Sequence, residues 1–198
     1  MNNPSHEARK ESPLKERITD AAVELLINEG VAKTTTVAVQ KRAGVSRGAL
    51  LYHFPSRAEL LASTIERLVR LNEQQINESF PDDATRGADI EQALIVLSDN
   101  MAKPSYLAEM ELWAISRNDQ ELREALYQAE KAARSDLDRV VGKLLEPWKK
   151  HKEYQLLANL CVEFIRGVAF SDLLRRRPEY RGRMISEWVR LIKTNIGD

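Results

Sequence analysis

Cysteine and histidine are scarce in this chain of 198 residues, which contains one cysteine and three histidines. The single cysteine, Cys161, cannot form an intramolecular disulfide bond, which is typical of proteins of the reducing cytoplasm. The sequence also has no HExxH motif, no paired-cysteine spacing, no glycine-rich phosphate loop after a strand and no GxSxG elbow. We therefore expect neither an enzyme nor a bound metal or cofactor, and we expect Cys161 to be a packing residue.

An excess of charge of one sign and long hydrophobic runs are missing as well. Lysine plus arginine number 30, and so do aspartate plus glutamate, which gives a formal net charge of zero. This balance excludes a globally basic, histone-like protein but leaves room for local charged patches. The apolar runs are far shorter than the roughly 20 residues of a membrane-spanning helix, so we expect a cytoplasmic protein with no membrane partner. Residues 1–11 are polar and of mixed charge, which predicts a flexible arm.

Apolar residues recur at intervals of three and four along the rest of the chain, and the alternation typical of strands is missing. This periodicity predicts an all-α fold of about nine helices, with a loop near Phe80–Asp83. The expected helices cover approximately residues 13–29, 35–43, 46–53, 58–78, 87–102, 105–117, 119–146, 153–175 and 179–196.

A short helix, a glycine turn and a second short helix meet at Ala43-Gly44-Val45-Ser46. This order is typical of a helix-turn-helix motif, whose second helix enters the major groove of DNA. Ala43 is small enough for the helices to approach closely, and Gly44 tolerates the positive φ of a sharp turn. Ser46 has the right chemistry to cap the second helix.

The charges around this motif support an interaction with DNA. Between Val31 and Arg57 the chain has five basic residues and no aspartate or glutamate. Neutralisation of phosphates by such residues supplies much of the affinity of proteins for DNA. The five basic residues are Lys33, Lys41, Arg42, Arg47 and Arg57. The alternative is a chance solvated patch, and only the combination with the turn favours DNA binding.

Residues 14–65 resemble the N-terminal domain of the TetR family of bacterial transcriptional repressors. The resemblance depends on a set of short motifs in register: Glu29-Gly30, Thr34-Thr35, Arg42-Ala43-Gly44-Val45-Ser46, Arg47-Gly48-Ala49-Leu50, His53-Phe54-Pro55-Ser56-Arg57 and Glu59-Leu60-Leu61. It implies a DNA-binding domain of three helices at residues 12–57. It also implies an effector-binding and dimerisation domain at residues 58–198, connected through the helix 58–78.

The resemblance also implies roles for single residues. The residues expected to contact DNA are Thr35, Thr36, Arg47, Gly48, Ala49, Tyr52, His53 and Arg57. Arg47 is the candidate for contact with guanine, whereas His53 and Arg57 are candidates for phosphate contacts. Leu50 and Phe54 are expected to seat the recognition helix from within. Leu51 stands where the family commonly has a phosphate-binding tyrosine. That contact is therefore expected to be lost or to be made by Tyr52.

The C-terminal two-thirds is expected to bind a small-molecule effector and to dimerise. Aromatic and methionine side chains suit an adaptable apolar cavity. The candidates for the cavity are Met101, Tyr106, Met110, Trp113, Tyr127 and Phe164, although core packing is the preferred role for each residue taken singly. Glu109, Glu111 and Glu163 could meet a cationic effector, but the expectation for them is exposure on the surface.

Helices 153–175 and 179–196 carry wider apolar surfaces than one core-facing stripe requires, which favours an interface with a second copy. The alternative is that both helices are buried in a single core. The candidates for this interface are Leu157, Ile165, Ile185, Trp188, Val189 and Ile192. The whole pattern predicts a homodimeric repressor that binds a palindromic operator in double-stranded DNA and is released by a small molecule. A binding protein that no longer reads DNA, a helical enzyme and a transcriptional activator are the alternatives.

Overall fold

The structure is a computed structural model that describes residues 13–80, 90–175 and 178–196. This part of the chain is helical and holds no strand, so the all-α prediction is confirmed. The α-helices are α1 Pro13–Glu29, α2 Thr36–Ala43, α3 Arg47–His53, α4 Arg57–Ser79, α5 Ile90–Met101, α6 Pro104–Ser116, α7 Gln120–Leu144, α8 Tyr154–Arg175 and α9 Pro178–Ile196. The expected arm at 1–11 and most of the loop after Phe80 lie outside the described residues.

The helix ends agree with the sequence to within about three residues wherever both ends are described. Two short 3-10 helices, η1 Val31–Lys33 and η2 Glu146–Trp148, were not expected from the sequence. Proline stands at the first position of α6, where its missing N–H group would have no helical partner. The break expected at Pro104 is therefore the start of a helix.

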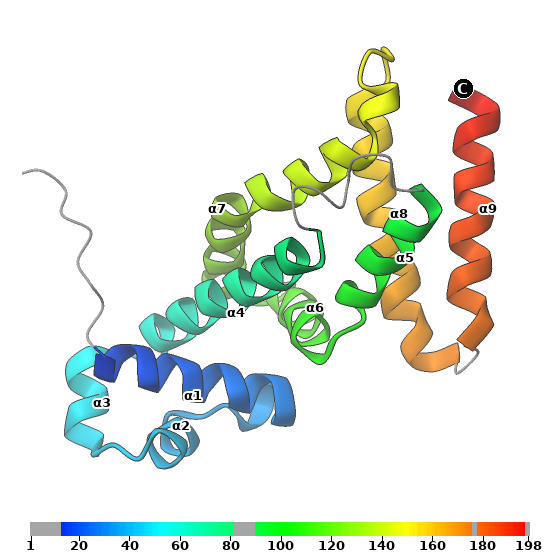
Figure 1. Cartoon of the computed structure of the whole chain (residues 1–198). Helices are drawn as coiled ribbons and strands as arrows, with labels where there is room; N and C mark the ends of the chain where they lie inside the picture. Colours follow the sequence, from blue (N-terminus) through cyan, green and yellow to red (C-terminus); the bar gives the residue numbers. More distant parts are fainter. Residues whose placement is uncertain (1–12, 81–89, 176–177, 197–198) are drawn as a thin grey trace, which may run out of the picture.

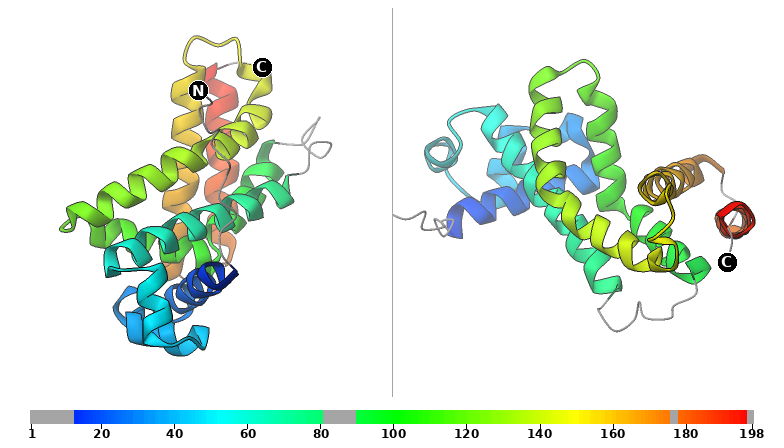
Figure 2. Two further views of the ribbon diagram at one scale, coloured as in Figure 1. Left: turned by 90° about the vertical axis from the view of Figure 1, so that its left-hand side faces the viewer. Right: turned by 90° about the horizontal axis from the view of Figure 1, so that it is seen from above.

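Figure 1 shows α1, α2 and α3 at one end of the molecule, and α8 and α9 at the other. Helix α4 leads from the first group into the body and packs along α7, while α5 packs against α8 and α9. The right-hand view of Figure 2 shows the same separation from above, with α9 far from the N-terminal helices. No helix among the described residues is both long enough and apolar enough to cross a lipid bilayer.

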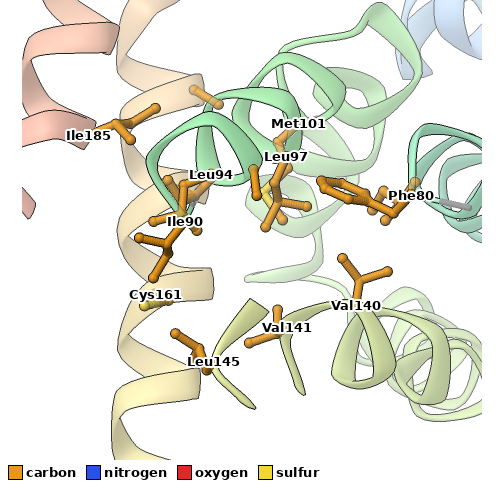
Figure 3. Close-up of a cluster of buried hydrophobic side chains, with 14 of the residues drawn as sticks. Phe80, Ile90, Leu94, Leu97, Met101, Val140, Val141, Leu145, Cys161 and Ile185 are labelled. Carbon is orange, nitrogen blue, oxygen red and sulfur yellow. The ribbon is translucent and has the colours of Figure 1, made fainter. Parts of the chain in front are cut away.

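Three clusters of buried apolar side chains hold this arrangement together. The first joins α1, α2, α3 and the start of α4 around Ile18, Val39 and Leu50. The second joins α1 to α4, α6 and α7, so that the N-terminal helices are attached to the body by continuous apolar packing. The third fills the body between α5, α7, α8 and α9 and includes Cys161, which is buried as expected (Figure 3).

Candidate nucleic-acid interface and internal cavity

The turn between α2 and α3 is built by the residues that the sequence indicates. Gly44 has φ +62 and ψ +40, which is the left-handed conformation that glycine adopts at the least cost. The side chain of Ser46 accepts a hydrogen bond from the backbone N–H of Ala49 at 3.1 Å, which caps the first turn of α3. Thr35 caps α2 in the same way through the N–H of Ala38 at 3.2 Å. Local hydrogen bonds therefore fix where α2 and α3 begin.

Helical spacing divides α3 into a buried and an exposed face. Leu50 and Phe54 are each only 2% exposed and pack into the N-terminal cluster. On the other face Arg47 and Gly48 are exposed, and Tyr52 is 82% exposed. Because a side chain as large as tyrosine is seldom left this open, Tyr52 is available for contact with a partner.

The remaining candidates for DNA contact lie around that exposed face. Thr35 and Arg57 are exposed, whereas Thr36, Ala49 and His53 are partly buried. The ring of His53 meets the ring of Tyr52 edge to face, with the centroids 5.1 Å apart. Leu51 is 43% exposed, so it presents an apolar patch beside Tyr52.

The cationic side chains near α3 are not equivalent. Arg42 donates to Glu24 and to Glu29 of α1, both at 3.4 Å, so its charge is balanced within the domain. Arg47 and Arg57 have no ion pair with any described residue, and both are exposed. Their charges remain available for phosphates or base edges. The structure thus separates Arg42 from the two arginines that the resemblance assigns to DNA.

A second site lies inside the body, where a cavity of about 590 Å³ opens between α4, α6, α7 and α8. This volume lies within the range typical of small-molecule sites. The cavity is lined by Val69, Asn72, Glu73, Ile76, Tyr106, Glu109, Trp113, Tyr127, Glu130, Lys131, Leu137, Asp138, Asn159, Val162, Glu163 and Arg166.

Three of the six candidates for the effector cavity line it, namely Tyr106, Trp113 and Tyr127. The prediction is wrong for the other three. Met101 is fully buried in the body cluster (Figure 3), and Met110 packs in the same cluster. Phe164 is not among the residues that line the cavity, and its ring stacks on Trp188, with the centroids 4.8 Å apart.

Glu109 stands in the wall of the cavity and is only 5% exposed, so the expectation of a surface position is wrong for this residue. Its carboxylate accepts a hydrogen bond from the side-chain amide of Asn72 at 2.6 Å. Asn72 is also 5% exposed, and its Oδ1 atom has no hydrogen-bond partner among the described residues. A buried carboxyl group and an unpaired amide oxygen thus lie side by side.

Burial raises the pKa of Glu109 to about 7, and the hydrogen bond from Asn72 opposes this rise. Nearby, the guanidinium group of Arg166 donates to the Tyr106 hydroxyl at 2.9 Å and to Glu163 at 2.8 Å. It also lies over the ring of Trp113, 4.6 Å from the centroid. The charge of Arg166 is therefore stabilised by three neighbours and does not pair with Glu109.

One residue of α6 connects the body to the N-terminal helices. Glu111 accepts a hydrogen bond from the backbone N–H of Val31, at 3.2 Å, directly after the end of α1. Gly30 has φ +79 at this point, and a Cβ atom there would come within 3.3 Å of the Glu111 carboxylate. The helix that lines the cavity thus also touches the helix-turn-helix domain, through a residue whose role the sequence did not indicate.

The residues expected at an interface between copies are mostly inside the chain. Leu157, Ile165, Ile185, Val189 and Ile192 are at most 5% exposed and form part of the body cluster. The prediction is therefore wrong for these five, because the sequence does not say which side of an apolar helix faces its own core. Trp188 is partly exposed.

A different set of residues makes up the exposed apolar surface of α8 and α9. It includes Leu156, Leu160, Phe170, Leu173 and Leu174 of α8 and Leu191 of α9, all 40–90% exposed. Most of them recur at steps of three or four, so they follow one face of α8. We call this surface the α8–α9 face.

Asn72, Glu109 and Arg166 are the cavity residues that sequence reasoning missed or misplaced. A signal existed for the first: Asn72 interrupts the apolar stripe formed by Ile65, Leu68 and Ile76. For Glu109 the signal is its spacing, because it lies three residues after Tyr106 and four before Trp113. No metal site is formed by three or more His, Cys, Asp or Glu side chains in the described part of the chain.

The fold and the exposed α3 define a helix-turn-helix protein with a separate helical body. Residues 18–64 match the model of the bacterial regulatory proteins of the tetR family. The matched residues include α2, α3 and the turn between them. An uncharacterized HTH-type transcriptional regulator of Mycobacterium bovis, Mb2936c, is 28% identical over 110 residues. The matched region covers 56% of this chain and 56% of that protein, so the chain spans about half the length of the curated relatives it matches.

Solved structures show the same fold over nearly the whole chain. A transcriptional regulator from Rhodococcus sp. Rha1 is 22% identical, with a TM-score of 0.69 and coverage of 91% of this chain and 96% of that chain. The multidrug binding protein EbrR, complexed with imidazole, is also 22% identical, with a TM-score of 0.65 and coverage of 96% of both chains.

Proposed function

We propose that this protein is a homodimeric transcriptional repressor that binds a palindromic DNA operator and is released from it by a small-molecule effector. The observation that carries the proposal is the exposed face of α3, where Arg47 and Tyr52 project from a helix held by a glycine turn and a serine cap. Recognition helices of this kind read base edges in the major groove with their N-terminal residues. The match of residues 18–64 to the model of the tetR family supports the same role.

The α8–α9 face supports the homodimer. Exposed apolar side chains that line up along one face are rare on monomers and mark contact sites. Gly167 lies within the same stripe, and nothing approaches the position of its missing side chain within 4 Å, so a partner helix could come close. If a second copy packs on this face with two-fold symmetry, the dimer carries two α3 helices. Two such helices match an operator whose half-sites lie about one helical turn, roughly 34 Å, apart.

The cavity and its connection to α1 support the effector. EbrR has been solved with ethidium as well as imidazole, and a further regulator of this fold has been solved with choline. In this chain α6 contributes Tyr106, Glu109 and Trp113 to the cavity and Glu111 to the contact with Val31. A ligand that binds the DNA-incompetent arrangement of these helices more tightly releases the DNA.

Selection of bound fragments from the genomic DNA of the source organism tests the proposal. We expect enrichment of an inverted repeat, and we expect that enrichment to disappear with the double variant Arg47→Ala and Tyr52→Ala. Fragments recovered without a common sequence would contradict operator recognition. The genes beside the repeat then indicate whether binding lowers or raises transcription.

The homodimer has its own test. Leu160→Glu combined with Leu174→Glu places charges in the α8–α9 face, and we expect the mass in solution to fall from that of a dimer to that of a monomer. Val37→Glu is the matched control, because Val37 is 58% exposed at the opposite end of the molecule. A dimeric mass for the double variant would exclude this interface.

A further inference from the structure

We propose that the cavity selects an organic cation that carries at least one N–H group, which donates a hydrogen bond to Glu109 or to Asn72. The apolar part of the ligand then lies between the aromatic side chains Tyr106 and Tyr127. The inference rests on the proposed effector function, because it names the chemical class of the effector. It goes further in distinguishing a protonated amine or amidine from a quaternary ammonium ion.

The requirement for an N–H group follows from the unpaired acceptors in the wall. Among the described residues, the buried Oδ1 atom of Asn72 has no hydrogen-bond partner, and Glu109 receives one hydrogen bond, from the same amide. A buried polar atom without a partner costs free energy, which a ligand donor recovers. A quaternary ammonium ion has no N–H group, so neither the Oδ1 atom of Asn72 nor the carboxyl group of Glu109 gains a hydrogen bond from it.

The requirement for positive charge follows from the ionisable groups that line the cavity together with Glu109. These are Glu73 from α4, Tyr106 from α6, Glu130 and Lys131 from α7, and Glu163 and Arg166 from α8. Asp138 adds a further carboxylate to the cavity lining. Among the described residues that line the cavity, carboxylates therefore outnumber basic groups, and Arg166 is already bound to Tyr106 and Glu163. An anionic ligand would have to meet the buried carboxyl of Glu109.

One donor in the same wall also lacks a partner, the indole N–H of Trp113. It accommodates an acceptor atom on the ligand and does not favour either charge. The arrangement thus fits a flat or branched amine with an apolar body, rather than a polyanion such as a nucleotide. A volume of about 590 Å³ is ample for a ligand of this kind.

Binding of such a cation is coupled to a proton. Because the pKa of Glu109 is about 7 in the protein without a ligand, the carboxyl group is mostly neutral below that pH. A cation beside it favours the ionised form, so binding below pH 7 releases a proton. The affinity for the cation therefore rises as the pH increases from about 6 to about 8, by roughly tenfold, and then levels off.

Two probes that differ in one group test the proposal. N,N-dimethyl-1-naphthylmethylamine is protonated at neutral pH and carries a single N–H, whereas its N,N,N-trimethyl analogue has the same charge and no N–H. We expect calorimetric titration of the full-length protein to show tighter binding of the dimethyl probe, by about tenfold to a hundredfold. We also expect proton release with the dimethyl probe at about pH 6, detected as a dependence of the heat on the buffer.

The variant Glu109→Gln keeps the shape of the side chain and removes its titration. It should lose the pH dependence and most of the preference for the dimethyl probe. Glu66→Gln changes the charge by the same amount on the exposed surface of α4, outside the cavity, and should behave as the unaltered protein does. If the trimethyl probe binds as tightly as the dimethyl probe, or if Glu109→Gln binds both unchanged, the proposal is wrong. Exclusive binding of the anion 1-naphthylacetate also overturns it.

The fluorescence anisotropy of a labelled duplex, recorded in the same samples, separates this inference from the proposed function. If the duplex binds and neither cation binds, the ligand class is wrong while DNA binding stands. If the dimethyl probe binds as expected and the duplex is never bound, the ligand class stands and the proposed function fails.

Discussion

The two ends of this protein place their candidate functional groups in opposite environments. Around α3 the charged and aromatic groups are exposed, and Tyr52 is the extreme case at 82%. In the cavity two polar groups are enclosed, since Glu109 and Asn72 are each 5% exposed. At the α3 end the charged side chains are already in contact with water, so folding does not desolvate them before they bind a charged polymer. In the cavity, burial of Glu109 makes ionisation of its carboxyl group less favourable. Variants of α3 should therefore change how DNA binding depends on salt, whereas variants of Glu109 should change how stability depends on pH.

The largest expected effect sharpens the contrast within α3 itself. Leu50 is 2% exposed and Leu51 is 43% exposed, although they are neighbours in the chain. Leu50→Ala should lower the free energy of unfolding by about 2–5 kcal/mol, since it leaves a cavity under the recognition helix. Leu51→Ala should change it by no more than about 0.5 kcal/mol. Denaturation with urea measures both, and equal losses would show that α3 is not seated through Leu50.

The second prediction concerns the enclosed end. The pKa of Glu109 is about 7 in the folded protein, against an ordinary value of 4.5, so the folded state binds more protons between these values. The free energy of unfolding therefore contains a contribution that is complete below about pH 4.5 and is lost as the pH rises through about 7. The Glu109→Gln variant lacks this pH-dependent loss. The free energy of unfolding of the variant minus that of the original protein should therefore increase between about pH 4.5 and about pH 7, by on the order of 3 kcal/mol.

Urea denaturation of both proteins at a series of pH values measures this difference. Glu66→Gln is the control for a change of charge on the exposed side of α4. If the free energies of unfolding of Glu109→Gln and of the original protein differ by a constant amount from about pH 4 to about pH 8, Glu109 is not held in a neutral form.

The third prediction returns to the exposed end. Arg47 is exposed at the first position of α3 and has no ion pair among the described residues. Arg47→Ala should lose about 1–3 kcal/mol of binding free energy through the loss of contact with one base pair. The variant should then bind the original operator and operators altered at that base pair with equal affinity. Competition between operator variants gives this result. An equal loss on all of them would assign Arg47 to the phosphate backbone.

The smallest expected effect concerns Arg57, at the N-terminus of α4. A cation at a helix N-terminus suits a phosphate, so Arg57→Ala should weaken binding to operator and random DNA alike. The slope of log K against log salt should become shallower by about 0.9, the value for one phosphate contact. Arg42→Ala is the control, because Arg42 is paired with Glu24 and Glu29. An unchanged slope for Arg57→Ala would remove its phosphate role.

The sequence predicts the N-terminal end well, because the signals there are local. The glycine turn at Gly44, the caps at Thr35 and Ser46, and the division of α3 into two faces depend on residues close together in the chain. The family model matches the same region. The DNA contacts themselves stay predictions, and the domain boundary at residue 57 does too.

The sequence predicts the body less well, since its sites form between distant segments. Asn72 and Glu109 are 37 residues apart and meet only when α4 packs beside α6. Helix α8 is apolar on two sides, so its periodicity could not show that Leu157 and Ile165 face the core while Leu160 and Leu174 face outward. Helical spacing gives the faces of a helix but not the neighbour of each face.

The central claim is that the exposed face of α3 binds duplex DNA, and the titration of a random duplex at increasing salt tests it most directly. The account predicts an affinity that falls steeply and linearly on a logarithmic scale, with a shallower slope for Arg57→Ala. Selected operator DNA should bind more tightly than the random duplex at every salt concentration. An absence of binding at low salt, or an affinity independent of salt, would contradict the account and favour a small-molecule-binding protein that does not read DNA.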